Sequence, residues 1–180
     1  MPPLPDSDDA LMARYSQTGE RACYEALFRA WAPRLNSYFL RHVGDPNRAQ
    51  DMVQLTFLHV HRARKDFRAG SPFRPWVYTI AANVRRQHFR RKARKPEAAW
   101  DPDRHREPAV GPDASTAEQR LVRRALAQLP DGQREVVLLH WYEGLGFKEI
   151  AEIVGASHSA VKVRAHRAYQ ALRELLDADR

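Results

Sequence analysis

The chain has 180 residues, of which 43% are hydrophobic and 29% are charged, and its net charge is +8. This length allows one medium domain or two small ones, and the excess of Lys and Arg favours a polyanionic partner, either nucleic acid or an anionic membrane surface. No apolar run approaches the ~20 residues that a membrane span needs, and no signal peptide is recognisable at the N-terminus. A single cysteine excludes an internal disulfide. We therefore expect a cytoplasmic protein that is not inserted in a membrane.

The first half of the chain is predicted to be helical almost throughout. Apolar residues recur near helical spacing in four stretches, residues 6–18, 20–43, 46–65 and 72–95. The fourth stretch ends in a run from Arg85 to Lys95, in which seven of eleven residues are Lys or Arg and none is acidic. These charges recur on every side of the helix, so the run must face a polyanion or solvent. Trp76 and Tyr78 precede it, and they either pack in a core or stack on unpaired bases.

Residues 96–115 differ in composition from the segments on either side. They include four prolines and five acidic residues, and they have few large apolar side chains. Such a segment cannot bury enough apolar surface to order itself. We therefore predict a flexible acidic linker at 96–115 between a domain at 6–95 and a second domain at 116–177.

The second domain is predicted to contain a helix-turn-helix. Helical patterns cover residues 116–128, 132–141, 147–154 and 157–176, and Gly155 lies where the turn requires a positive φ. Ala151 is small where two helices must cross closely, and Ser157 can cap the last helix. No segment alternates with period two over a useful length. The predicted fold class is therefore all-α, with two small helical domains joined by a flexible linker.

The last helix has an apolar face and a polar face. Val161, Ala165, Ala168 and Leu172 recur on the inward face, while Lys162, Val163, His166 and Arg167 lie on the other. Long donors near the N-terminal half of such a helix can reach base edges and phosphates in the major groove. A solvated basic face on a structural helix would show the same pattern. The turn upstream and the second basic run, at 85–95, favour DNA binding.

The motifs in series resemble those of bacterial sigma factors of the extracytoplasmic function class. The stretch 28–39 is similar to the first core region of that family, and 49–57 (Ala-Gln-Asp-Met-Val-Gln-Leu-Thr-Phe) resembles its polymerase-binding segment. Residues 73–83, with the basic run after them, resemble the part that melts and reads the −10 promoter element. Residues 129–172 resemble the domain that reads the −35 element. The resemblance implies a factor that binds core RNA polymerase and directs promoter-specific transcription initiation.

The resemblance also implies roles for individual residues. Contacts with core polymerase are expected from Asp51, Gln54 and Phe57. Contacts with −10 DNA are expected from Arg68, Ser71, Asn83, Arg85, Arg86, Arg90 and Arg91. The −35 groove is expected to face Ser157, His158, Ser159, Lys162, Val163, His166 and Arg167. In the recognition helix, Ala160, Val163 and Ala165 depart from a Gly-Thr-Val-Lys-Ser pattern that is frequent in the family. The resemblance therefore implies DNA binding and does not by itself imply the usual −35 sequence.

The partners implied by the resemblance are core polymerase, through its β′ clamp helices and β flap, promoter DNA and an anti-sigma factor. An anti-sigma factor could hold the protein at the inner membrane. No cofactor, metal or small-molecule substrate is expected. The main alternative is a stand-alone helix-turn-helix repressor or activator, whose N-terminal half would serve dimerisation or ligand binding. A metal enzyme is disfavoured, because His59 and His61 lie about 200° apart around a helix and cannot share a ligand face.

Overall fold

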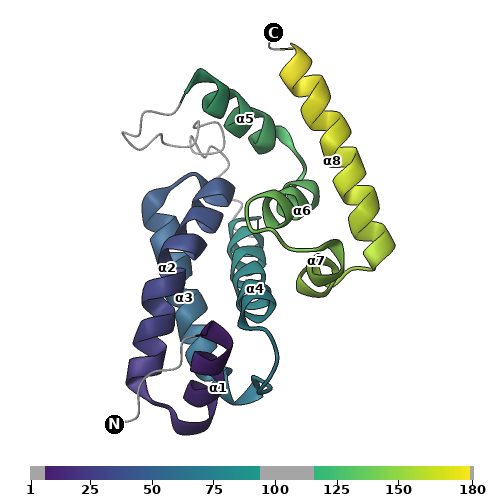
Figure 1. Ribbon diagram of the computed structural model, residues 1–180. Coiled ribbons are helices and arrows are strands. Elements are labelled where there is room, and N and C mark those ends of the chain that lie inside the picture. The colour runs from purple at the N-terminus through teal and green to yellow at the C-terminus, as the bar shows by residue number, and fades with distance from the viewer. Residues whose placement is uncertain (1–6, 94–115, 179–180) are drawn as a thin grey trace. The chain divides into compact units, whose positions relative to one another are not determined.

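The computed structural model describes residues 7–93 and 116–178, and within these residues all regular secondary structure is helical (Figure 1). The described residues form two compact units, one on each side of residues 94–115. The predicted all-α class is thereby confirmed. The expected linker at 96–115 lies outside the described residues, and the domain limits 6–95, 96–115 and 116–177 stay predictions. In the two described ranges, no helix combines the length and the apolar character that crossing a membrane requires.

The first unit is a bundle of four α-helices and one short 3-10 turn. Its elements are α1 (Asp8–Thr18), α2 (Arg21–Val43), α3 (Pro46–Arg62), the 3-10 turn η1 (Arg64–Asp66) and α4 (Phe73–Ala93). α2 packs against α1 and α3, and α3 packs against α4. Large aromatic side chains fill the core, and the buried Trp31 ring meets Phe73 and Tyr78 edge-on at centroid distances of 5.3 and 5.9 Å. These contacts fix α4 on α2.

Short sequence signals set the helix limits in this unit. Gly44 ends α2 in the left-handed region, with φ of 70°. The side chain of Asp45 then accepts hydrogen bonds from the backbone N–H groups of Asn47 and Arg48, and Pro46 occupies the first position of α3. The predicted helix at 46–65 is therefore confirmed at its start, whereas its last residues form η1 instead.

Two hydrogen bonds connect the start of α1 to α2 and α4. The Asp9 carboxylate accepts a hydrogen bond of 2.7 Å from the backbone N–H of Phe73, which is the first residue of α4. The indole N–H of Trp31 donates to Asp8 at 2.9 Å. The N–H groups at the start of a helix have no partner within that helix, so the bond from Asp9 supplies one of them in α4 with an acceptor from a distant part of the chain.

The second unit consists of α5 (Ala117–Gln128), α6 (Asp131–Trp141), α7 (Phe147–Val154) and α8 (His158–Ala178). α8 packs against each of the other three helices. One core cluster joins α5, α6 and α8 through buried Leu126, Leu129, Val137, Leu138 and Ala168. Tyr169 and Leu172, both partly buried, extend this cluster along α8.

The connection between α7 and α8 has the geometry of a helix-turn-helix. Gly155 has a φ of 66°, in the left-handed region that favours glycine, and its N–H bonds to the carbonyl groups of Ala151 and Glu152. The hydroxyl of Ser157 accepts a hydrogen bond of 3.1 Å from the N–H of Ala160 and so caps α8. The conformation predicted for Gly155 and the cap predicted for Ser157 are both present.

Candidate nucleic-acid and polymerase interfaces

The outward face of α8 consists mainly of exposed polar and charged side chains. Val161, Ala165 and Ala168 are buried against the other helices, as their spacing predicts. The residues expected to face the −35 groove are all exposed, namely Ser157, His158, Ser159, Lys162, Val163, His166 and Arg167. The face therefore offers cationic, hydroxyl and imidazole groups, together with a single apolar side chain.

The N-terminus of α8 contributes to the same surface. Unpaired backbone N–H groups at a helix start carry partial positive charge, which attracts anionic groups such as phosphate. Ser157 partly satisfies these groups, and its hydroxyl also lies 3.0 Å from that of Ser159. Ser157 therefore has a structural role as the cap, in addition to its exposed position at the edge of the face.

The arginines of α4 do not share one environment. Arg90 and Arg91 are exposed and Arg86 is half-buried. Arg85 is only 3% exposed, and its guanidinium lies 5.7 Å from the centroid of the Phe89 ring. The Arg85 side chain is therefore buried in this structure, unlike the exposed side chains of Arg90 and Arg91.

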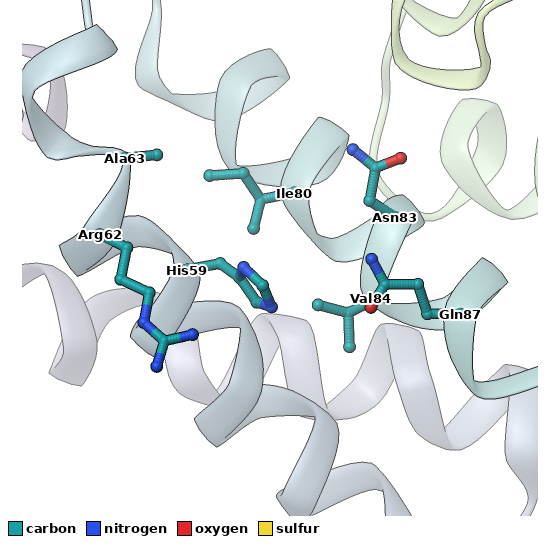
Figure 2. A pocket seen from close by; sticks show the side chains of 7 residues that line it. All are labelled: His59, Arg62, Ala63, Ile80, Asn83, Val84 and Gln87. Atoms are coloured by element: carbon teal, nitrogen blue, oxygen red, sulfur yellow. The ribbon is translucent and has the colours of Figure 1, made fainter. Parts of the chain in front are cut away.

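Asn83 lies on α4 at the edge of a pocket of about 220 Å³ between α3 and α4 (Figure 2). His59 and Arg62 line it from α3 and Ala63 from the C-cap position after that helix, while Ile80, Val84 and Gln87 line it from α4. Figure 2 shows the His59 ring and the Val84 side chain pointing toward one another across it. The pocket is smaller than the 300–1,000 Å³ usual for drug-sized ligands. Its lining is mixed: Ala63, Ile80 and Val84 contribute apolar side chains, and the remaining residues contribute amide, imidazole and guanidinium groups.

The Asn83 amide is oriented by a neighbour on the same helix. Its Oδ1 accepts a hydrogen bond of 2.7 Å from Arg86. The Asn83 amide nitrogen retains two N–H donors for another acceptor. Arg68 and Ser71, which are also expected to contact −10 DNA, do not line the pocket. They belong to the turn before α4, where the Ser71 N–H donates to the Arg68 carbonyl at 3.0 Å.

The sequence allows either core packing or base stacking for Trp76 and Tyr78, and the structure gives the two residues different environments. Tyr78 is 1% exposed and belongs to the core, whereas Trp76 is half-buried and packs edge-on against Phe67 at 5.2 Å. Core packing therefore accounts for Tyr78. Trp76 still presents part of its ring at the surface.

The outward face of α3 combines polar and apolar side chains. Asp51 and Gln54 are exposed, as expected of contact residues. Leu55 and Leu58 are 43% and 40% exposed, and their spacing from Asp51 places all four side chains on one face of the helix. The inner face of α3 is apolar, and the two exposed leucines add apolar surface to an outer face that is polar in an ordinary amphipathic helix. We call these four residues the α3 face.

Phe57 does not belong to the α3 face. It is 1% exposed, and its ring packs against Phe28 at 4.7 Å and against Tyr24 at 5.9 Å. A direct contact with a partner would therefore have to come from its neighbours. Leu55 and Leu58 were missed by the sequence analysis, although their i+4 and i+7 spacing from Asp51 was a signal that could have identified them.

The four histidines that the structure describes in the first unit lie in different environments. His42 is buried in α2 beside Tyr38, at a centroid distance of 4.8 Å. His59 lines the pocket, and His61 shares a hydrogen bond of 2.6 Å with the hydroxyl of Tyr15. His88 packs against Phe89. Over the ranges that the structure covers, no three His, Cys, Asp or Glu side chains gather in a metal-binding group.

Comparison with known families matches both units. The profile of sigma-70 region 2 matches residues 27–95, and the profile of sigma-70, region 4, matches residues 119–172. A stand-alone helix-turn-helix regulator would not account for the match to region 2. The matched segments include the α3 face and the pocket in the first unit, and the outward face of α8 in the second.

Individual relatives extend the similarity over most of the chain. The RNA polymerase sigma factor CarQ of Myxococcus xanthus is 38% identical over 159 residues, which cover 88% of this chain and 91% of the relative. The ECF RNA polymerase sigma factor SigF of Caulobacter vibrioides is 32% identical, covering 92% and 91%. The solved structure of CnrH in complex with the cytosolic domain of CnrY has a TM-score of 0.74 at 29% identity, covering 97% of this chain and all of that one.

The family consists of factors that bind core RNA polymerase and promoter DNA, and its members are not enzymes. Region 2 and region 4 both match this chain, with region 2 first. CarQ and SigF are each more than 30% identical to it over most of its length. The chain therefore belongs to the sigma-70 family of RNA polymerase sigma factors, in the extracytoplasmic function class, with a region 2 domain and a region 4 domain.

Proposed function

We propose that this sigma factor divides its contacts among three surfaces, with the α3 face on core polymerase, α4 and its preceding turn on the −10 element, and α8 on the −35 element. The observation that carries this proposal is the outward face of α8. Every side chain expected at the groove is exposed there, and the helix follows a turn at Gly155. A helix with this geometry enters the major groove with its N-terminal residues toward the bases.

On the polymerase side, the α3 face provides the chemistry of a docking surface. Two exposed leucines can be buried on contact, while Asp51 and Gln54 offer a carboxylate and an amide that fix orientation. Phe57 supports the surface from below through its contact with Phe28. The β′ clamp helices are the proposed partner of this face, and the β flap is the proposed polymerase contact of the region 4 domain.

On the −10 side, the pocket at Asn83 would receive one extruded base, and the exposed Arg90 and Arg91 would hold backbone phosphates. Arg86 would act through Asn83, whose amide it orients. Extruding a base costs a few kcal/mol, so binding of core polymerase must contribute to melting. Arg68 and Ser71 would contact DNA from the turn before α4. Arg85 would reach a phosphate only after leaving its buried position.

Regulation by a protein that covers one of these surfaces fits the comparisons. CnrH, at 29% identity, is bound to the cytosolic domain of CnrY in its solved structure. We place this chain in the cytoplasm, where an anti-sigma factor with a cytosolic domain would keep it from core polymerase. A membrane-anchored anti-sigma factor would hold it at the inner membrane.

The α3 assignment is tested by binding of the full chain to core polymerase and by run-off transcription. The double variant Asp51→Ala, Gln54→Ala should bind core at least about tenfold more weakly, as expected when contacts near the centre of an interface are lost. The matched control is Arg21→Ala, Glu25→Ala, which removes an exposed ion pair of α2 on the same unit. Unchanged core binding and initiation by the first variant would refute the assignment.

The same preparations test whether promoter binding depends on core polymerase. A sigma factor should bind promoter duplexes tightly only together with core polymerase. Tight and sequence-specific binding by the chain alone would contradict this dependence.

A further inference from the structure

One side chain on the outward face of α8 has a chemistry different from that of the other six. Val163 is 48% exposed, whereas the side chains around it are polar or charged, apart from the small Ala160. At about 100° per residue, Val163 lies about 140–160° around the helix from each of the buried residues Val161, Ala165 and Ala168. It therefore stands near the centre of the outward face, where a recognition helix comes closest to base edges.

The neighbours of Val163 leave room for a base to approach it. On a helix surface, the residues three and four positions away are adjacent, and these are Ser159 and Ala160 on one side and His166 and Arg167 on the other. The first two are small. His166 and Arg167 are longer and exposed, so they reach past the valine toward groups at the sides of the groove.

A valine side chain has no hydrogen-bond donor or acceptor, so it cannot read the polar pattern of a base pair. The one apolar group that base pairs present in the major groove is the C5 methyl of thymine. Opposite any other base, the valine would cover a polar base edge without pairing it, which costs free energy. Contact with the thymine methyl, by contrast, removes apolar surface of both groups from water.

We propose that Val163 selects a thymine in the upstream promoter element by contact with its C5 methyl group. This inference rests on the proposed −35 role of α8 and adds the base that its central residue requires. Ser159 and Ala160 admit the methyl group, while Lys162, His166 and Arg167 supply the polar and phosphate contacts around it. The departure of this helix from the frequent family pattern then has a function, namely a changed base preference.

The test removes the methyl group alone. Holoenzyme reconstituted from the full chain and core polymerase first selects its upstream element from duplexes randomised in that region. Each selected thymine is then replaced in turn by deoxyuridine, which keeps base pairing and lacks the C5 methyl. At one position, the replacement should weaken binding by the wild type about fourfold, which corresponds to about 0.8 kcal/mol for one buried methyl-sized group at 1.4 kcal/mol per factor of ten.

The variant Val163→Ser should bind thymine and deoxyuridine duplexes equally at that position. The matched control is Val122→Ser on α5, which changes a valine of 37% exposure in the same unit outside the recognition helix. This control should keep the fourfold response of the wild type. An element selected without thymine, a scan without a responsive position, or an equal response in Val163→Ser would each overturn the inference.

A further pair of variants separates this inference from the proposed function. If α8 does not read the upstream element at all, Lys162→Ala and Arg167→Ala should leave holoenzyme binding unchanged on every duplex. If α8 reads the element but Val163 does not select thymine, these two variants should weaken binding while the methyl group has no effect.

Discussion

Replacing Gly155 by alanine should destabilise the second unit through the backbone alone. The φ of Gly155 is 66°, and a Cβ built on it would meet no heavy atom within 4 Å. The substitution therefore creates no clash, and its cost is that of holding an L-residue in the left-handed region, about 1–2 kcal/mol. In a domain of 60–100 residues, each kcal/mol lowers the melting temperature by about 4–8 °C.

Gly132 provides a control of the same chemistry with the opposite expected sign. It lies in α6, its φ is not positive, and an added Cβ would lie 4.0 Å from Nη1 of Arg164, which is an ordinary contact. Gly132→Ala should therefore stabilise the unit by about 0.4–1 kcal/mol, because alanine reduces the freedom of the unfolded chain. Gly155→Asn should cost less than Gly155→Ala, since asparagine tolerates the left-handed region better.

The free energy of unfolding can be read from hydrogen exchange of the slowest amide groups in α6 and α8 of the full chain. Unfolding of the first unit does not enter that measurement. If Gly155→Ala exchanges at the wild-type rate, or if Gly132→Ala is destabilised as much as Gly155→Ala, the turn is not held by the conformation described and the reasoning fails.

Three other predictions concern the first unit. Leu58→Asp should weaken binding to core polymerase at least about tenfold, while the unfolding free energy changes by less than about 0.5 kcal/mol. Unchanged affinity in a direct binding titration would contradict this prediction. Arg90→Ala with Arg91→Ala should reduce the slope of log affinity against log salt by about two, and an unchanged slope would mean that neither side chain meets a phosphate. Burial raises the pKa of Tyr15 and Tyr24 above the ordinary 10.0, so the folded state holds both protons more tightly than the unfolded chain. The unfolding free energy should therefore fall as pH rises above that value, and urea titrations giving a flat profile there would contradict this.

The helices were predictable because their limits rest on local chemistry. Gly44, Asp45 and Pro46 each impose a backbone preference that needs no tertiary information, and α3 begins where they place it. The end of the same helix was extended too far, because η1 continues the turn with different hydrogen bonds while the apolar pattern does not change. The face of α8 was predictable for the same reason, since a period of 3.6 assigns every residue to a side.

The site residues of the first unit were harder to predict because their environments depend on packing between helices. The sequence shows Arg85 as one of a run of basic residues, whereas in the structure its side chain is buried and lies beside the Phe89 ring. Phe57 shows the same difficulty. Its polar neighbours suggest a contact with polymerase, yet its ring packs against Phe28 and Tyr24 and is buried. Leu55 and Leu58 carried a usable signal, because leucines that share a face with Asp51 contradict an amphipathic pattern.

The hydrogen bond between Asp9 and the N–H of Phe73 joins residues that are 64 positions apart. The family profile of region 2 begins only at residue 27, so the segment that supplies this bond lies before the matched core. The helix that carries Asn83 and the arginines thus takes its N-terminal acceptor from the opening turn of α1. Shortening or tagging the chain near Asp9 would therefore act at a distance on the helix proposed to contact the −10 element, and region 2 expressed by itself should be more stable when α1 is kept.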